Sequence, residues 1–324
     1  MIRWGILAAG NIAGKFTADL LLAGHTVTAV GSRSAPKAAD FAARYGLGRS
    51  HGSYEALVAD PEVDAVYVAT PHPMHAPAAR LAIAAGKHVL IEKPFTLNAA
   101  EAQDIMERAE AKGVVLLEAM WTRFLPHMIR LREVLASGMI GTPLTLVATH
   151  NQDLPDDPEH RLNNPMLGGG ALLDLGIYPV SFAHDVFGKP VSIAASGRLR
   201  NTGVDAEVSA ILRYASGSTA LVLTASDSAG PNTAQITGSE GYIEIDGTWY
   251  VPTTFRVYDS KKTLIDTYVS SVGGRGMQFQ AAELERLVAA GQTSSELMPV
   301  SESVEIMQTL DAIRAQIGVR YPGE

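Results

Sequence analysis

The regular alternation of short apolar runs with helical patterns over the first 120 residues most strongly constrains the fold of this chain. Glycine and proline punctuate the short connections between these segments. Such an alternation predicts a parallel sheet with helices on both faces. The expected strands are Ile2–Ala8, Thr26–Gly31, Val63–Thr70, His88–Ile91 and Val114–Leu117, and the expected helices are Ile12–Leu22, Pro36–Tyr45, His75–Ala85 and Asn98–Ala111.

The pattern changes after residue 120, where short strands with alternating faces are separated by turn signals, as in an antiparallel sheet. Because 324 residues exceed the usual size of one domain, we expect two, residues 1–122 and residues 123–324. The expected strands are Pro143–His150, Glu207–Tyr214, Ser218–Ala225, Thr233–Thr237, Tyr242–Ile245 and Thr254–Tyr258, within a strand-rich region from Val191 to Val269; helices are expected at Trp121–Ser137, after Gly168–Gly170, at Met277–Ala290 and at Ser301–Ile317.

Composition narrows the class of protein. The chain carries 26 Lys and Arg against 34 Asp and Glu, a formal net charge of −8, which argues against a broad electrostatic surface for nucleic acid or anionic lipid. The lack of cysteine excludes disulfides, thiolate zinc, iron–sulfur ligation and a cysteine nucleophile. No apolar run has the length of a membrane span, and a strand pattern follows directly on the first residue. We therefore expect a cytoplasmic protein with a small-molecule partner, without nucleic acid or membrane.

The turn after the first strand has the position of a phosphate-binding loop. The segment Ala8-Ala9-Gly10-Asn11-Ile12-Ala13 lies between a strand and a helix, where a tight turn lets the backbone approach a pyrophosphate at the helix N-terminus. Of the G-x-G-x-x-G pattern only Gly10 is present, and Ala8 and Ala13 occupy the outer positions. A purely structural turn is the alternative, and the surrounding strand–helix–strand order favours dinucleotide binding by Ala8, Gly10, Asn11, Ile12 and Ala13.

The end of the second strand indicates which dinucleotide is bound. An NAD enzyme would place Asp or Glu there for the ribose hydroxyl, but this chain has Gly31-Ser32-Arg33-Ser34 and no acid before Asp40. The Arg33 guanidinium and the Ser32 hydroxyl suit a 2′-phosphate. We therefore expect NADP rather than NAD, with a solvated surface arginine as the alternative.

Two further strand ends would face the nicotinamide half of the cofactor. Thr70, Pro71, His72 and His75 follow one strand, and His72 and His75 form a possible metal pair without a third ligand, so no metal site is expected. Glu92-Lys93-Pro94 follows the next strand, and the proline-fixed turn would point Lys93 into the cleft. An ordinary surface lysine is the alternative.

Two segments beyond this point carry candidate substrate ligands. Trp121 and Arg123 lie at the expected domain junction, where the arginine could hold a polar substrate or a backbone carbonyl. Asp174 and Tyr178 are four residues apart and share one face of a regular helix, although Pro179 disfavours helical geometry just before it. A core tyrosine with a satisfied hydroxyl is the alternative for Tyr178.

These residues belong to a set of stretches that resembles the glucose–fructose oxidoreductase and inositol dehydrogenase family. Within that family the similarity is to the branch of dimeric dihydrodiol dehydrogenases and NADP-dependent D-xylose dehydrogenases. The family usually has His at the position of Tyr178, and tyrosine is the variant of this branch. The matching stretches are Arg3-Trp4-Gly5-Ile6, Gly52-Ser53-Tyr54-Glu55, Ala85-Gly86-Lys87, Glu92-Lys93-Pro94, residues 118–126, residues 169–178, Gly203-Val204-Asp205 and residues 312–322.

The resemblance implies an N-terminal Rossmann domain with a doubly wound parallel sheet. It also implies a C-terminal α+β domain with an open, mostly antiparallel sheet, often used for dimerisation, so a homodimer is expected. It further implies that Lys93 and Tyr178 are the catalytic pair and that Asp174 lines the pocket. Ala8 departs from the family's usual glycine. The substrate implied is a cyclic diol or a sugar.

A proton-transfer mechanism fits these residues. Oxidation of an alcohol by a nicotinamide needs a protein group that takes the hydroxyl proton. A free tyrosine titrates near ~10, and a nearby ammonium favours the phenolate. We hypothesise that Tyr178 relays the proton while Lys93 holds the substrate oxygen, with the two roles open to exchange, and that Asp174 orients Lys93 or a second hydroxyl. The alternative function is a catalytically silent NAD(P)-binding regulator of the same fold; a zinc alcohol dehydrogenase lacks its ligands.

Overall fold

The computed structural model of this protein describes residues 2–324, and their contacts divide the chain into two compact units. The first unit runs to Trp121 and also includes Gly274–Val304, and the second comprises Thr122–Gly273 and Glu305–Glu324. The domain boundary drawn from the sequence, between residues 122 and 123, stays a prediction. Because Gly274–Val304 belongs to the first unit, a single boundary in the sequence does not separate the two units.

The first unit contains a six-stranded sheet in the order β3-β2-β1-β4-β5-β6, with every neighbouring pair parallel. This is the strand order of a doubly wound dinucleotide-binding fold, so the predicted parallel sheet is confirmed. The strands are β1 (Arg3–Leu7), β2 (Thr26–Gly31), β3 (Arg49–His51), β4 (Ala65–Val68), β5 (His88–Glu92) and β6 (Leu116–Ala119), and the helices between them are α1 (Asn11–Leu22), α2 (Ala35–Tyr45), α3 (Tyr54–Val58), η1 (His72–Met74), α4 (His75–Ala84) and α5 (Ala99–Lys112).

Two short elements of this unit, β3 and α3, were not predicted. Strand β3 has the sequence Arg-Ser-His and is largely solvent-accessible, so it lacks the apolar pattern that marks a buried strand. Helix α3 has five residues and is capped by Ser53, whose hydroxyl accepts a hydrogen bond from the backbone N–H of Ala56 at 3.1 Å. Elements this short depend on their neighbours more than on their own periodicity.

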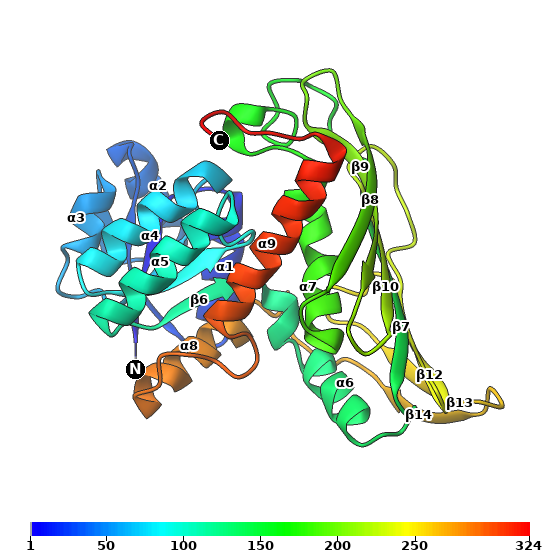
Figure 1. Cartoon of the computed structure of the whole chain (residues 1–324). Coiled ribbons are helices and arrows are strands. Elements are labelled where there is room, and N and C mark those ends of the chain that lie inside the picture. The colour runs from blue at the N-terminus through cyan, green and yellow to red at the C-terminus, as the bar shows by residue number, and fades with distance from the viewer. Residues whose placement is uncertain (1) are drawn as a thin grey trace. The chain divides into compact units, whose positions relative to one another are not determined.

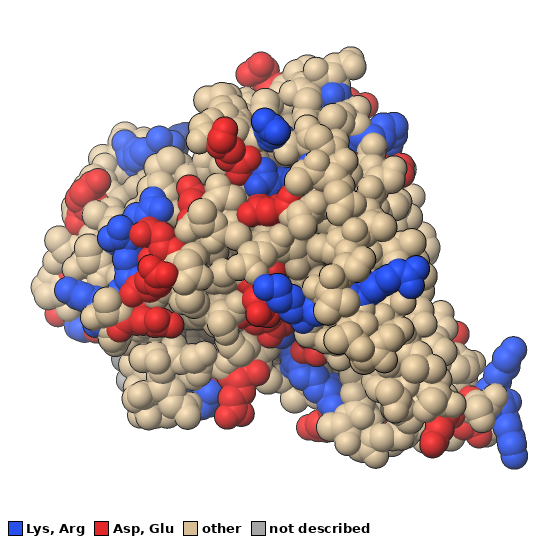
Figure 2. All heavy atoms as spheres, in the orientation of Figure 1, with Lys and Arg blue, Asp and Glu red and all other residues tan. Residues whose placement is uncertain are grey.

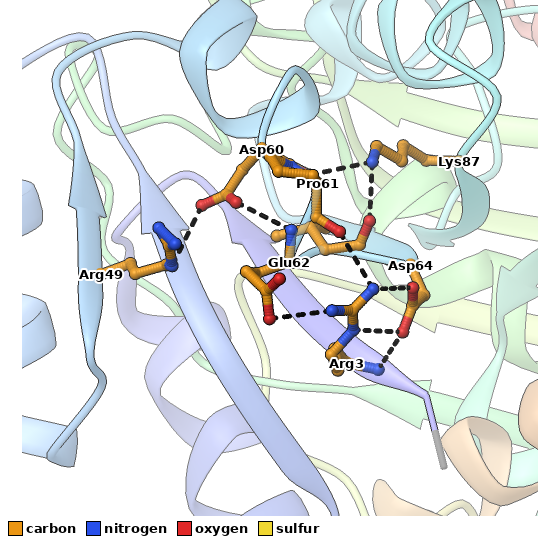
Figure 3. Close-up of polar contacts among 8 residues, drawn as sticks. Arg3, Arg49, Asp60, Pro61, Glu62, Asp64 and Lys87 are labelled. Carbon is orange, nitrogen blue, oxygen red and sulfur yellow. Dashed lines mark hydrogen bonds and ion pairs between the residues drawn. The ribbon is translucent and has the colours of Figure 1, made fainter.

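A network of ion pairs and hydrogen bonds joins the amino ends of three strands of this sheet (Figure 3). The guanidinium of Arg3 binds both carboxylate oxygens of Asp64, at 2.7 and 2.8 Å, and Glu62 at 2.9 Å. Its hydrogen bonds to Asp64 hold the pKa of that carboxyl below the ordinary value. Lys87 donates to the carbonyls of Asp60 and Val63 at 3.0 and 2.7 Å. Arg3 and Lys87, which carry part of the family resemblance, are therefore structural residues at the edge away from the phosphate turn.

The returning segment carries α8 (Gln278–Ala290) and is anchored to α1. Asp19 of α1 accepts hydrogen bonds from the backbone N–H groups of Arg275, at 3.2 Å, and Met277, at 3.0 Å. The indole of Trp4 donates to Glu285 of α8 at 2.9 Å. These bonds fix the start and the middle of α8 within the first unit.

The second unit contains an eight-stranded sheet in the order β14-β13-β12-β11-β7-β10-β9-β8. Its pairs are antiparallel except for β7 and β10, which are parallel, so the predicted open, mostly antiparallel sheet is confirmed. The strands are β7 (Pro143–Asn151), β8 (Ser192–Leu199), β9 (Asp205–Arg213), β10 (Thr219–Ala225), β11 (Ala234–Gly238), β12 (Gly241–Ile245), β13 (Phe255–Asp259) and β14 (Leu264–Tyr268).

The sheet's edge strands, β8 and β14, were missing from the predicted strands. Both are mostly exposed or half-buried along their length. An edge strand with little buried surface has no strong alternation of apolar and polar residues, which is the signal that sequence reasoning uses.

Helices cover one face of this sheet, and Figure 1 shows α7 lying along it. Helix α7 contacts β7 and β10. The predicted helix Trp121–Ser137 is interrupted, because Leu125 is extended before Pro126. The helical elements are η2 (Trp121–Phe124), α6 (Pro126–Ala136), η3 (Pro165–Leu167), the π-helical turn η4 (Leu172–Gly176), α7 (Ile177–Phe187) and α9 (Val300–Ile317), which spans the boundary between the units.

One helical segment of the described chain, Pro165–Phe187, is long and apolar enough to cross a membrane by length and composition alone. However, 89% of its most apolar stretch is buried inside the protein, so core packing accounts for its composition. On the face shown in Figure 2, acidic and basic side chains of the described residues are interspersed, and neither sign gathers into a large area.

Candidate active site

The phosphate turn begins at Ala8, directly after β1. Ala8 has a φ of +85° and donates its backbone N–H to the carbonyl of Gly31 at 2.9 Å. This left-handed conformation favours glycine, and it explains why a glycine is usual at the position where this chain has alanine. The bond joins the turn to the end of β2, the strand that precedes Arg33.

Gly10 precedes α1, and its surroundings fit a bound phosphate. Its φ of −87° is open to any residue, and a Cβ placed on it would meet nothing within 4 Å among the described residues. Neither the backbone nor the protein packing therefore requires glycine there. No described side chain caps the N-terminus of α1, and its first turn has no acidic residue. Open space beside uncapped amide groups is what a pyrophosphate needs, so the turn fits a dinucleotide.

The loop after β2 places Ser32 and Arg33 differently. Ser32 is buried, and its hydroxyl accepts a hydrogen bond from the backbone of Ser34 at 3.2 Å. Arg33 is exposed, and its guanidinium forms no ion pair with a described residue. Ser32 thus stabilises the turn, while the guanidinium of Arg33 is available to bind an anionic ligand.

At the end of β4, His75 is fully buried between two backbone carbonyls. Its Nε2 lies 2.8 Å from the oxygen of Thr70, and its Nδ1 lies 2.8 Å from the oxygen of Pro94. Burial lowers its pKa to about 4, so the ring is neutral at physiological pH and donates to one of the two. His75 therefore ties the end of β4 to the turn after β5. His72 lies beside it with ring centroids 5.7 Å apart, and the described residues contain no cluster of three possible metal ligands.

The turn after β5 holds Lys93 between two fixed neighbours. Glu92 is buried and accepts hydrogen bonds from the hydroxyl of Tyr67 and from the backbone N–H of Lys93, the latter at 3.2 Å. The ring of Tyr67 stacks on Phe16 of α1 at 3.8 Å. Pro94 follows in a cis peptide bond. A continuous set of contacts therefore runs from the phosphate helix to the backbone of Lys93, and Tyr67 is a member that sequence reasoning missed. Its only signal was a hydroxyl in an otherwise apolar, buried strand.

The two candidate residues at the domain junction fall in different units. Trp121 lies in the first unit, with the Arg275 guanidinium 5.6 Å from its ring centroid. Arg123 lies in the second unit and is buried. It donates to the carbonyl of Ser181 at 2.9 Å and lies 3.5 Å from Asp185. Arg123 thus holds α7 through a backbone carbonyl, one of its two predicted uses, and its use as a substrate ligand stays a prediction.

Asp174 and Tyr178 lie on one helical segment that changes its winding between them. Residues 172–176 form a π-helical turn, and regular α-helix resumes at Ile177. Pi-helical turns are rare in proteins overall, and those that occur are often found at functional sites. Asp174 is buried and accepts from Arg161 at 3.2 Å, and Tyr178 is 7% exposed. The extra residue in this turn means that the spacing rule of a regular helix does not apply to the pair.

Pro179 leaves a backbone carbonyl near Tyr178 without its usual helical hydrogen bond. A proline has no N–H for the carbonyl four residues before it, which here is the carbonyl of Leu175. The Nδ1 of His150, on β7, lies 3.1 Å from that oxygen, and Gln152 approaches the ring's Nε2 at 2.8 Å. Donation by Nδ1 leaves Nε2 as the acceptor from the Gln152 amide, so the two contacts assign one neutral tautomer.

The same imidazole packs against the Tyr178 ring. Its centroid lies 4.9 Å from that of Tyr178 in an edge-on arrangement and 3.8 Å from that of Tyr250 in a stack. Sequence reasoning missed His150 and Tyr250. The alternation of Leu146, Ala148 and His150 along β7 was the available signal, because it places all three on the buried face.

Family models match both parts of the chain. A model described as the oxidoreductase family with an NAD-binding Rossmann fold matches residues 2–120, and the GFO/IDH/MocA C-terminal domain matches residues 128–244. The chain belongs to the GFO/IDH/MocA oxidoreductase family. This confirms the family resemblance found in the sequence.

Relatives of this GFO/IDH/MocA protein share its whole length. Trans-1,2-dihydrobenzene-1,2-diol dehydrogenase of Mus musculus is 39% identical over 99% of this chain and 98% of its own, and the Homo sapiens protein of that name is 36% identical with the same coverage. A 3-ketoreductase from Actinomadura kijaniata, solved with NADP and TDP-benzene, is 27% identical, with a TM-score of 0.86 and 98% coverage of both chains. These similarities show that this family member is a dehydrogenase with a nicotinamide cofactor, not a catalytically silent regulator.

The positive φ of Ala8 yields a stability prediction. A left-handed conformation costs a residue with a Cβ roughly 1–2 kcal/mol, which exceeds the roughly 0.4–1 kcal/mol that a glycine costs through the unfolded chain. Ala8→Gly should therefore raise the free energy of unfolding, by up to about 1.6 kcal/mol. The control Ala9→Gly, at the neighbouring residue without a positive φ, should lower it. Denaturant unfolding measures both, and equal destabilisation by the two variants would contradict strain at Ala8.

Proposed function

We propose that this protein is an NADP-dependent dehydrogenase that transfers a hydride between the nicotinamide and a hydroxyl-bearing carbon of a cyclic diol or sugar. The observation that carries the proposal is the full-length similarity to trans-1,2-dihydrobenzene-1,2-diol dehydrogenases. Arg33 is exposed after β2, and no acidic residue stands between that strand and Asp40, which supports NADP. So does the solved complex of the related 3-ketoreductase with NADP.

In the proposed mechanism Lys93 and Tyr178 act on the same oxygen of the substrate in different ways. A nicotinamide dinucleotide held at the phosphate turn of Ala8 and Gly10 would supply the redox chemistry, as the acceptor of a hydride from the substrate carbon. Tyr178 takes the hydroxyl proton of the substrate, and the Lys93 ammonium holds the same oxygen and stabilises its developing negative charge. Asp174 orients Lys93 or a second hydroxyl. Glu92 holds the backbone of Lys93, and the His150 ring packs against the Tyr178 ring, which supports these two roles.

Removing the Lys93 ammonium or the Tyr178 hydroxyl should greatly lower turnover while the protein still binds the cofactor. Lys93→Met and Tyr178→Phe should each lower kcat at least ~10²-fold, because each removes a group that acts on the reacting oxygen. NADP affinity, measured by fluorescence titration, should stay within a few-fold of that of the unaltered protein. Lys189→Met is the matched control, since Lys189 is an exposed lysine whose ammonium donates to Gln308, and its kcat should not change. Full turnover by Lys93→Met or Tyr178→Phe would refute the assignment.

Cofactor preference should depend on Arg33. A charge-assisted hydrogen bond contributes about 1.5–3 kcal/mol, so Arg33→Ala should weaken NADP binding roughly ten- to a hundredfold and leave NAD binding nearly unchanged. Lys37→Ala, which removes another exposed cation at the start of α2, serves as control for net charge. Equal losses for the two cofactors would overturn the NADP assignment.

We also propose a homodimer formed through the uncovered face of the eight-stranded sheet. Ile211, Leu221 and Val147 stand side by side across β9, β10 and β7, and each is 37–40% exposed. A contiguous apolar row on a sheet is typical of an interface. Sedimentation should give twice the 34.4 kDa chain mass, and Leu221→Lys should shift the protein to the monomer. A monomer for the unaltered protein at micromolar concentration would contradict the proposal.

A further inference from the structure

Two stretches that carry the family resemblance have no part in the proposed chemistry, Gly203-Val204-Asp205 and residues 312–322. In the second unit they meet at one place, the glycine turn that leads into the helix of Asp174 and Tyr178. Figure 1 shows the end of the chain lying beside the segment before that helix. Their shared location suggests a shared role at the start of the helix.

Asp205 binds the first turn of this helix. The side chain is fully buried, and its Oδ2 accepts a hydrogen bond from the backbone N–H of Leu172 at 2.6 Å. Burial raises the pKa of this carboxyl to about 6, and the amide groups of Leu172 and Ala171 and the charge of Arg314 oppose that rise. The group is therefore ionised at neutral pH, and an anion at a helix N-terminus is stabilised by the uncapped amides.

The glycine before the helix lies in close contact with this carboxylate. Gly170 has a φ of +123°, and a Cβ placed on it would lie 2.3 Å from Oδ1 of Asp205. Only glycine therefore allows the backbone to come this close to the buried acid. The preceding Gly169 is equally confined, because its Cβ would lie 2.7 Å from the carbonyl oxygen of Leu162.

The C-terminal segment holds the same turn from a second side. The buried hydroxyl of Tyr321 donates to the carbonyl of Gly169 at 2.6 Å. Glu324 accepts from the backbone of Tyr321 at 3.1 Å and pairs with Arg314 at 2.7 Å. The Arg314 guanidinium lies 4.9 Å from the Tyr321 ring centroid and 2.6 Å from Asp311. The last residues are therefore closed onto α9, with the Tyr321 hydroxyl directed at the glycine turn.

The position of Tyr178 depends on where its helix begins. Residues 171–187 are helical without interruption, and the π-helical turn runs from Leu172, the partner of Asp205, to Gly176, two residues before Tyr178. The helix lies close on β10, since a Cβ at Gly176 would be 3.0 Å from the side chain of Thr224. A shift of the first turn therefore moves Tyr178 relative to the sheet that carries His150.

We propose that Asp205 and Tyr321 are positioning residues for Tyr178, which set where its helix begins and thereby where its hydroxyl lies. The inference rests on the proposed function, in which Tyr178 exchanges the substrate proton. Neither Asp205 nor Tyr321 touches substrate or cofactor in this scheme. Their effect on turnover therefore passes through Tyr178.

A double-mutant comparison separates positioning from general stability. Tyr321→Phe keeps the ring on Arg314 and removes only the bond to Gly169. It should lower kcat roughly tenfold or more, since small misplacements of a reacting group have effects of this size. In a Tyr178→Phe background the same change should lower the residual kcat by less than about twofold, because the group being positioned is gone. Asp205→Asn should behave in the same way, and Tyr321→Phe keeps the proposal testable where Asp205→Asn does not fold.

Tyr214→Phe is the matched control. Tyr214 is a buried tyrosine of the same unit whose hydroxyl has no partner among the described residues, and its loss should leave kcat unchanged. Hydrogen–deuterium exchange gives a second readout without catalysis, and peptides covering residues 170–178 should exchange faster in Tyr321→Phe and not in Tyr214→Phe.

Each remaining outcome decides the matter. Unchanged kcat in Tyr321→Phe, equal losses with and without Tyr178, or unchanged exchange over residues 170–178 would overturn the positioning role. Full turnover by Tyr178→Phe alone would instead overturn the proposed function, and it is recognised without any change at Tyr321.

Discussion

In a parallel sheet all strands end at the same edge, and this constraint brings the candidate residues of the first unit together. The order β3-β2-β1-β4-β5-β6 places the ends of β1 and β4 side by side where the winding reverses, which is where such folds bind ligands. The phosphate turn, the loop of Arg33, the carbonyl of Thr70 and the turn of Lys93 all follow strands of this sheet. Hydrogen bonds then tie the strand ends to one another, through Ala8 to Gly31 and through His75 to Thr70 and Pro94.

The second unit positions Tyr178 by a different device. Pro179 removes a helical hydrogen bond, the π-helical turn precedes it, and His150 takes up the carbonyl of Leu175. The glycine run before the helix allows the backbone to approach Asp205, Tyr321 and the carbonyl of Leu162 closely. These glycines therefore serve packing within the chain itself. These contacts position Tyr178 within the second unit, while Lys93 belongs to the first unit.

The sequence predicted the elements with strong patterns and missed those without them. Strands buried on both faces, such as β4 and β5, were evident as apolar runs. Strand β3 and helix α3 are too short and too polar to be seen, and edge strands β8 and β14 lack a buried face. The return of Gly274–Val304 to the first unit depends on contacts such as Asp19 with Met277, which join residues far apart in sequence.

The candidate site was only partly predictable for related reasons. Motifs with a fixed spacing from a strand end, such as Gly10, Arg33 and Lys93, could be located from the sequence. Tyr67 and His150 are recognisable only once the strands are paired and the kink at Pro179 is seen. Arg3 and Lys87 carry part of the family resemblance, yet they belong to the network of ion pairs and hydrogen bonds at the opposite edge. Similarity to a family therefore marks structural residues as well as those that act on substrate.

The central claim is that one lysine and one tyrosine, from separate units, act on the same substrate oxygen. A crystal structure of the protein with NADP and an unreactive diol analogue tests it most directly. The account predicts that Nζ of Lys93 and the hydroxyl of Tyr178 both lie within hydrogen-bond distance of a single analogue oxygen next to the nicotinamide ring. A complex in which either group is directed away from that oxygen would contradict it.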